Sequence, residues 1–110
     1  MIYLMSTTVI PSGAWGTWAV EKVELADVAL AIFPEGGKPW TSAVGHESTA
    51  QFMSQLLGQE IPANRITVNP EPGDVFFCFK LNSRPPEGAI LSREQLENLG
   101  FEWAKMTYVG

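Results

Sequence analysis

The chain is 110 residues long and 45% hydrophobic, which is enough apolar material for one core but too short for two domains. Seven Lys and Arg against twelve Asp and Glu give a net charge of -5, which disfavours binding to duplex DNA or long RNA. No window approaches the ~18 consecutive apolar residues of a membrane span. The start lacks a signal peptide's basic and apolar segments, and the lone Cys78 has no internal disulfide partner. We therefore expect one cytoplasmic domain, residues 1–110, without membrane association.

Short apolar segments make up the first part of the chain. Residues 1–5 form an apolar run that predicts a strand, and this run leads into the polar turn Ser6-Thr7-Thr8. Alternating aromatic and β-branched side chains predict a second strand over Thr17 to Val23. Apolar residues at helical spacing predict a helix over residues 24–33, followed by a connecting loop over Lys38 to Trp40.

The middle of the chain predicts one longer helix and a pair of strands. Apolar residues at helical spacing predict a helix that begins close to His46 and stops at Gly58. Arg65 to Val68 and Val75 to Leu81 are rich in residues that favour strands. The turn between them, residues 70–74, makes the two segments a predicted hairpin with an extended connection.

The last part of the chain predicts a third helix and a final strand. Ser92 and Gln95 have the spacing of a capping box, and Gly100 closes the helix that follows. Phe101 to Val109 is an aromatic run typical of a strand. Strands interleaved with three short helices predict a small α/β domain, in which a mixed β-sheet carries short flanking helices.

His46 is the only histidine, and it lies between Gly45 and Glu47-Ser48-Thr49 at the predicted start of the central helix. Free backbone N–H groups and the positive end of the helix dipole suit that position for a phosphate. An imidazole there can donate a proton to a leaving oxygen. A histidine that only caps or packs at a helix start explains the same position, and on position alone this is the commoner case.

Other catalytic chemistries have weaker support. One His, one Cys and scattered carboxylates do not supply the clustered ligands of a zinc site, and no Asp-x-Asp cluster supports magnesium. A serine triad would need acidic support from Asp27, Asp74 or a Glu, and the sequence has no nucleophile-elbow motif. It also has no Walker or dinucleotide-binding glycine pattern. We therefore expect no metal and no other cofactor.

Two further segments carry polar groups. In Arg84-Pro85-Pro86-Glu87-Gly88, two prolines stiffen a loop that holds a cation and a carboxylate three residues apart. Arg84 is placed to clamp a phosphate and Glu87 to position a ribose hydroxyl or a catalytic partner, or the two form a surface ion pair worth ~0 to 1 kcal/mol. Asn64-Arg65 offers a third polar group, or a solvated strand end.

Aromatic residues and the single thiol leave further alternatives open. The tryptophans can stack on adenines, yet in a small domain most are expected in the core or at a dimer contact. They are Trp15, Trp18, Trp40 and Trp103. Cys78 lies in an apolar run, where we expect it to be buried and inert.

Several segments form a recognisable set when their order and spacing are considered together. They are residues 42–50 (Ser-Ala-Val-Gly-His-Glu-Ser-Thr-Ala), Leu56-Leu57-Gly58, residues 62–66 (Pro-Ala-Asn-Arg-Ile), Glu71-Pro72-Gly73-Asp74, and residues 84–88 with Ile90-Leu91. The set resembles the viral ring nucleases, type III anti-CRISPR proteins with cellular relatives that degrade cyclic tetra-adenylate. The run from Gly45 to Thr49 is the strongest part of the resemblance.

The resemblance implies a homodimer with the cyclic ligand across its two-fold axis, so that each subunit treats one of two opposite phosphodiesters identically. It implies a metal-independent cleavage in which a ribose 2′-hydroxyl attacks the adjacent phosphorus and leaves a 2′,3′-cyclic phosphate. By this analogy His46 is the general acid that protonates the departing 5′-oxygen.

The resemblance also assigns roles to other polar residues. Arg84 and Arg65 hold phosphate charge, and Glu87 orders the site. The remaining ligand-binding residues belong to the helix start and the early turn: Gly45, Ser48, Thr49, Ser6 and Thr7. The family often has an Asn-containing turn after its first strand, where this chain has Ser6-Thr7-Thr8.

Three functions therefore compete. A ring nuclease would switch off type III CRISPR signalling, a non-catalytic sponge would only sequester the same ligand, and a protein-interaction module would use the aromatic surface. His46 favours cleavage, because a pure binder needs no titratable proton donor. Scattered positions for Arg65, Arg84 and His46 would favour the interaction module.

Overall fold

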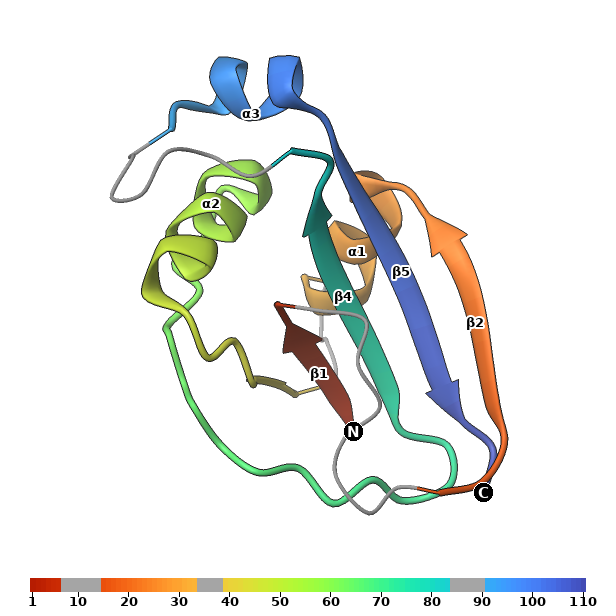
Figure 1. The fold of residues 1–110 in the computed structure, drawn as a ribbon. Helices are drawn as coiled ribbons and strands as arrows, with labels where there is room; N and C mark the ends of the chain where they lie inside the picture. Colours follow the sequence, from red (N-terminus) through yellow and green to blue (C-terminus); the bar gives the residue numbers. More distant parts are fainter. Residues whose placement is uncertain (7–14, 34–38, 84–90) are drawn as a thin grey trace.

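The computed structural model describes residues 1–6, 15–33, 39–83 and 91–110, and these contain five strands and three helices. In chain order they are β1 (Ile2–Met5), β2 (Trp18–Val23), α1 (Leu25–Ile32), β3 (Trp40–Ser42), α2 (Glu47–Leu57), β4 (Val75–Leu81), α3 (Arg93–Leu99) and β5 (Phe101–Tyr108) (Figure 1). The strands form one sheet in the order β2-β5-β4-β1-β3. Strand β1 runs parallel to β3 and β4, whereas β5 runs antiparallel to β2 and β4. The predicted α/β fold with a mixed sheet and short flanking helices is confirmed.

Helix ends follow the local signals in the sequence. Helix α3 begins with a capping box, in which Gln95 N–H donates to Ser92 Oγ at 3.2 Å and Ser92 N–H donates to Gln95 Oε1 at 2.9 Å. Helix α1 begins with a similar reciprocal pair between Glu24 and Asp27. Helix α2 ends at Gly58, whose φ of 70° is the left-handed conformation that glycine adopts most readily. These boundaries agree with the predictions.

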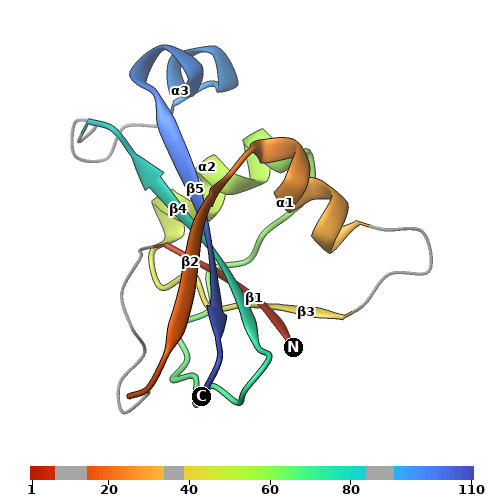
Figure 2. The same cartoon turned by 90° about the vertical axis from the view of Figure 1, so that its right-hand side faces the viewer.

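The main core lies between the sheet and the helices. Figure 2 shows α1 and α2 on the same side of the sheet. Alternate strand residues point to this side, and each large apolar side chain buried there stabilises the fold by roughly 1.5–3 kcal/mol. This core includes Leu4, Phe77, Phe79 and Trp103 from the strands and Val28, Phe52, Met53, Leu56 and Leu96 from the helices.

The opposite side of the sheet, called the open face below, carries no helix among the described residues. Its residues come from β1, β2, β4 and β5: Tyr3, Met5, Trp18, Phe76, Cys78, Ala104 and Met106. Tyr3 stacks on Phe76 with ring centroids 4.9 Å apart, and Trp18 contacts Phe76 and Tyr108 at 5.5 and 4.8 Å. An aromatic row therefore crosses this face.

Trp40 begins a strand, so the predicted loop over Lys38 to Trp40 is wrong at its last residue. Local composition suggested a connection because Pro39 precedes Trp40. The strand forms because β1 supplies a partner far away in sequence, with Ile2 opposite Trp40. Ala43 N–H extends the pairing by donating to the Leu4 carbonyl at 2.8 Å.

The predicted hairpin between Arg65 to Val68 and Val75 to Leu81 is also wrong. Residues 65–68 belong to no strand, and β4 pairs with β1 and β5 instead. Asn64 N–H donates to the Val44 carbonyl at 2.7 Å, which ties the start of this segment beside the end of β3. Val68 packs into the open-face cluster. The β-forming residues here therefore pack beside the sheet without joining it.

Candidate functional site

The topology places a candidate ligand site at the carboxyl ends of the parallel strands. Strands β3 and β4 lie on opposite sides of β1, so the strand order reverses there. In open α/β sheets, ligands bind outside the carboxyl ends of the strands at such a point. Leu4 is level with Ser42 in the register of β1 and β3. Ser6, which follows β1, and the Gly45-His46 pair, which follows β3, therefore lie at the same edge of the sheet.

His46 is the N-cap residue of α2, with an extended backbone (φ -121°, ψ 124°). Its carbonyl accepts the Ala50 N–H at 3.0 Å, which closes the first turn of the helix. Its side chain makes no capping hydrogen bond and is exposed. The imidazole therefore makes no side-chain cap of α2 and does not lie in the buried core.

The Arg65 side chain lies beside Gly45, the residue immediately before the N-cap. A β-carbon at Gly45 would be 3.6 Å from Arg65 Nε and 3.9 Å from Arg65 Cγ. The guanidinium group and the positive end of the α2 dipole therefore act on the same region of space. A cation, unbonded helix N–H groups and an exposed imidazole together can bind a phosphate and supply it with a proton.

A set of short hydrogen bonds holds residues 62–64 against residues 42–44. Ser42 Oγ donates to the Pro62 carbonyl at 2.6 Å, and Asn64 Nδ2 donates to the Ser42 carbonyl at 2.7 Å. Ser42 is buried, with 4% of its surface exposed. Sequence reasoning missed Ser42, because its partners are 20 and 22 residues away and no local pattern identifies them.

The other expected site residues fall into two groups. Ser48 is exposed and Thr49 half-buried in the first turn of α2, and Ser6 is half-buried after β1. The structure thus brings Arg65 to the helix start that already carries Gly45. Three expected residues lie outside the described residues: Thr7, Arg84 and Glu87.

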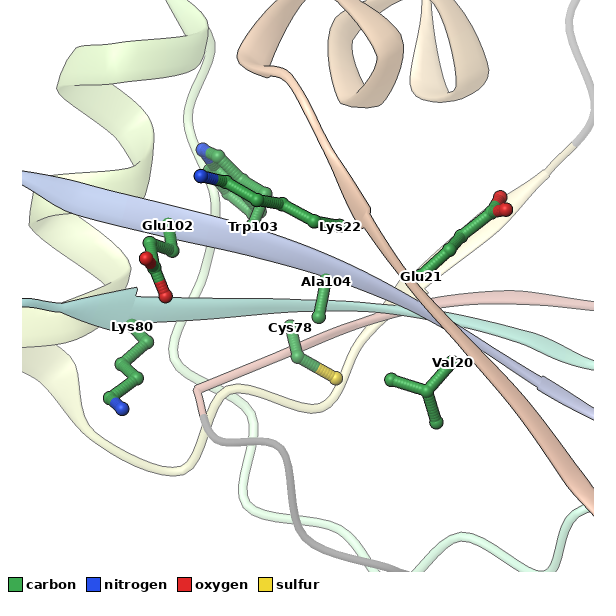
Figure 3. Close-up of a pocket in the computed structure, with 8 residues that line it drawn as sticks. All are labelled: Val20, Glu21, Lys22, Cys78, Lys80, Glu102, Trp103 and Ala104. Carbon is green, nitrogen blue, oxygen red and sulfur yellow. The ribbon is translucent and has the colours of Figure 1, made fainter.

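A hollow of about 270 Å³ lies on the open face, where its lining comes from β2, β4 and β5 (Figure 3). Small side chains, Cys78 and Ala104, form part of its lining, together with Lys22, Lys80 and Glu102. Burial raises the pKa of the Cys78 thiol to about 12, so it carries no thiolate near neutral pH. The prediction that Cys78 is buried is confirmed.

A second hollow of about 650 Å³ lies between α2 and residues 60–63. Glu47, Gln51, Gln55 and Glu60 give it an acidic and amide-rich lining. Neither hollow is lined by His46 or Arg65. The candidate site is therefore a surface at the start of α2 rather than either of these two hollows.

The tryptophans occupy different environments. Trp103 is in the main core with 2% of its surface exposed, as expected, and Trp40 packs against the edge of that core. Trp18 lies in the aromatic row of the open face. Trp15 is 85% exposed.

Two further observations concern metal ions and membranes. Within residues 1–6, 15–33, 39–83 and 91–110, no three His, Cys, Asp or Glu side chains are grouped as metal ligands would be. In the same ranges, no helix has the length and apolar character needed to cross a lipid bilayer.

The fold and the candidate site define a small α/β protein with a mixed five-stranded sheet and a polar site where a helix follows a parallel strand. The chain belongs to the STIV B116-like family, whose model matches residues 2–103. Its fold is similar to that of B116 of Sulfolobus turreted icosahedral virus, with a TM-score of 0.79, 21% sequence identity and coverage of 96% of this chain and 97% of that one.

Similar sequences occur in a bacterium and in viruses. The uncharacterized protein YddF of Bacillus subtilis (strain 168) is 34% identical over 92 residues, which cover 84% of each chain. The uncharacterized protein ORF117 of Acidianus two-tailed virus is 32% identical over 104 residues, which cover 93% of this chain and 88% of the viral one. Proteins similar to this chain are therefore found both in a bacterium and in a virus.

Proposed function

We propose that this protein is a metal-independent ring nuclease that binds cyclic tetra-adenylate as a homodimer and cuts it into linear di-adenylate with a 2′,3′-cyclic phosphate. Such an activity would switch off type III CRISPR signalling. The observation that carries the proposal is the position of the Arg65 side chain beside Gly45, the residue that precedes the exposed His46 at the start of α2. The resemblance of residues 42–50, 62–66 and 84–88 to the ring nucleases supplies the substrate class.

Binding in this proposal is local neutralisation of a phosphodiester. The first turn of α2 directs backbone N–H groups and a partial positive charge at the phosphate. Arg65 adds a full positive charge and charge-assisted hydrogen bonds. The net charge of -5 discourages long polyanions, whereas a compact ring meets only these few groups.

Cleavage is an internal transesterification. The ribose 2′-oxygen forms a bond to phosphorus while the bond from phosphorus to the 5′-oxygen breaks. His46 donates its proton to the departing 5′-oxygen, and the proton of the 2′-hydroxyl passes to water. A general acid in this role contributes ~100 to 10,000-fold in rate.

The homodimer is proposed to form through the open face. An aromatic row crosses this face, and Val20 at its edge is 61% exposed. Val68, three residues after Arg65, packs into the same face, so the segment that carries Arg65 continues along its border. A two-fold axis through the open face would present two copies of the site to two opposite phosphodiesters of one ring.

The decisive experiment is incubation of the purified protein with cyclic tetra-adenylate and excess chelator, followed by chromatography of the products. We expect linear di-adenylate that ends in a 2′,3′-cyclic phosphate. If the ring stays intact but binds tightly, the protein is a non-catalytic sponge and not a nuclease. An intact ring that does not bind would remove both functions and leave the protein-interaction module.

The role of His46 is tested with a matched pair of variants. His46→Ala should lower the cleavage rate by ~100-fold or more while ring binding persists, because the imidazole acts in the transition state. Gln51→Ala removes another exposed polar side chain from α2 and should leave the rate unchanged. Equal losses of binding and cleavage in His46→Ala would contradict the assignment of a general acid.

A further inference from the structure

The segment that precedes Arg65 is tied to the rest of the molecule at both ends. At one end, Ile61 N–H donates to Ser54 Oγ on α2 at 2.8 Å. At the other end, Asn64 donates its side-chain N–H to the Ser42 carbonyl and its backbone N–H to the Val44 carbonyl, each at 2.7 Å. The backbone of residues 61–64 is therefore fixed relative to both the end of β3 and the body of α2.

Arg65 has no comparable anchor of its own. Its side chain is exposed, and within the described ranges it forms no hydrogen bond or ion pair. Its position beside Gly45 therefore depends on where the backbone of Asn64 places it. An arginine on a loose segment would be carried through many backbone positions, and ordering that segment on ligand binding would cost backbone entropy.

Ser42 completes the connection between the two segments. Its hydroxyl donates to the Pro62 carbonyl at 2.6 Å and accepts the Val44 N–H at 3.4 Å, while its carbonyl accepts from Asn64. These bonds are buried or partly buried, where water competes poorly for the same groups. Ser42 and Asn64 thus join the strand end that leads to Gly45 with the segment that leads to Arg65.

We propose that Asn64 and Ser42 are positioning residues that hold Arg65 over the start of α2, and so pre-organise the phosphate site before ligand binds. The consequence for ring binding rests on the proposed function, whereas the placement of Arg65 does not. Asn64 acts through Arg65, so removing Asn64 should matter only while Arg65 is present.

A double-mutant cycle tests this dependence. Binding of cyclic tetra-adenylate is measured by calorimetry in a His46→Ala background, so that the ring stays intact. Asn64→Ala should weaken binding by roughly tenfold, and Arg65→Ala by at least as much. The double variant should bind no more weakly than Arg65→Ala alone. Losses that multiply would show that Asn64 acts independently of Arg65 and would overturn the proposal.

Two further variants separate positioning from general damage to the fold. Asn64→Asp keeps the size of the side chain and the backbone bond to Val44, but replaces the donor that faces the Ser42 carbonyl, so it should reproduce the effect of Asn64→Ala. Gln55, which lies on α2, donates a side-chain hydrogen bond of 2.6 Å to the Leu91 carbonyl. Gln55→Ala removes this bond and should leave binding unchanged. An equal loss in Gln55→Ala would make the effect a structural one.

A ligand-free measurement decides the placement of Arg65 by itself. Nuclear Overhauser contacts between the Arg65 side chain and Gly45 Hα should be present in the wild type and absent from folded Asn64→Ala or Asn64→Asp. Contacts that persist in those variants would overturn the proposal even if the ring binds. Loss of the contacts in a protein that never binds the ring would instead retain the positioning role and reject the proposed function.

Discussion

The side chain of Arg65 lies beside Gly45 at the start of α2, although the two residues belong to different segments. A β-carbon on Gly45 would meet Arg65 Nε at 3.6 Å and Cγ at 3.9 Å, which are ordinary contact distances. Gly45 also needs no left-handed backbone, since it is not among the glycines with positive φ. Neither the backbone conformation of residue 45 nor the position of Arg65 therefore requires glycine here, and under the proposed function an added side chain would narrow the approach of the ligand.

Gly45→Ala should weaken ring binding by about tenfold, equivalent to ~1.4 kcal/mol, because the methyl group occupies the surface where the phosphate approaches the helix N–H groups. The melting temperature should stay within ~2 °C of the wild type, since no backbone strain is added. Calorimetric binding and thermal unfolding of the same samples check both halves of the prediction.

Gly58→Ala is the control with the opposite profile. Gly58 has a φ of 70° and nothing within 4 Å of an added β-carbon, so the substitution costs only backbone strain. We expect a loss of ~1–2 kcal/mol in the free energy of unfolding and unchanged ring binding. Both variants behaving alike would mean that the helix start has no special role in binding.

Local signals in the sequence predicted the helices well and the strand pairing poorly. The capping box at Ser92 and the left-handed stop at Gly58 are short-range features, so the sequence predicts them directly. Trp40 and residues 65–68 were misassigned because their structure depends on partners distant in sequence. The parallel pairing of β1 with β3 and β4 also depends on partners distant in sequence, so the sequence did not predict it.

The candidate site shows the same division. His46 and Gly45 were found from their position at a predicted helix start, which is a local pattern. The sequence identifies Arg65 as a polar group, but its position beside Gly45 depends on the tertiary hydrogen bonds of Asn64 and Ser42. Those bonds link segments about twenty residues apart, and nothing within either segment specifies them.

Val20 and Leu30 are exposed apolar residues on different surfaces: Val20 lies at the edge of the open face, and Leu30 lies on helix α1. Val20 is 61% exposed on β2 and Leu30 is 72% exposed on α1. Val20→Arg should convert the proposed dimer into a monomer, because it buries an unpaired charge in the interface. Leu30→Arg should remain dimeric. Light scattering of both variants checks this, and a dimeric Val20→Arg protein would place the interface elsewhere.

Asp74 is buried, with 8% of its surface exposed, and its carboxylate joins the turn over residues 71–74 to Met1. It accepts the Glu71 N–H at 2.9 Å and the Met1 ammonium group at 3.1 Å. Asp74→Ala should lower the free energy of unfolding by ~1–3 kcal/mol, because both donors lose their acceptor. Chemical denaturation measures the loss, and an unchanged midpoint would show that water satisfies both donors.

The raised pKa of the Cys78 thiol makes the free energy of unfolding depend on pH in the alkaline range. Burial raises the pKa of its thiol from an ordinary 9.0 to about 12, so the folded protein holds this proton more tightly than the unfolded chain does. The resulting stabilisation is fully present below pH 9.0 and is lost as the pH rises towards 12. The pKa of Tyr3 is also raised above 10.0, first by burial and then by Asp74 and Glu71, which adds to the same trend.

The free energy of unfolding should therefore fall progressively above pH 9.0, and the fall should be shallower in Cys78→Ala, which retains only the Tyr3 contribution and that of other alkaline groups. Denaturant titrations from pH 7 to 11 measure both slopes. In the wild-type protein at pH 8, iodoacetamide should modify Cys78 rapidly only after unfolding, because Cys78 is 1% exposed in the native state. Rapid modification of the native protein would mean that the open face admits the reagent, and parallel slopes for the two proteins would mean that another group controls the alkaline loss of stability.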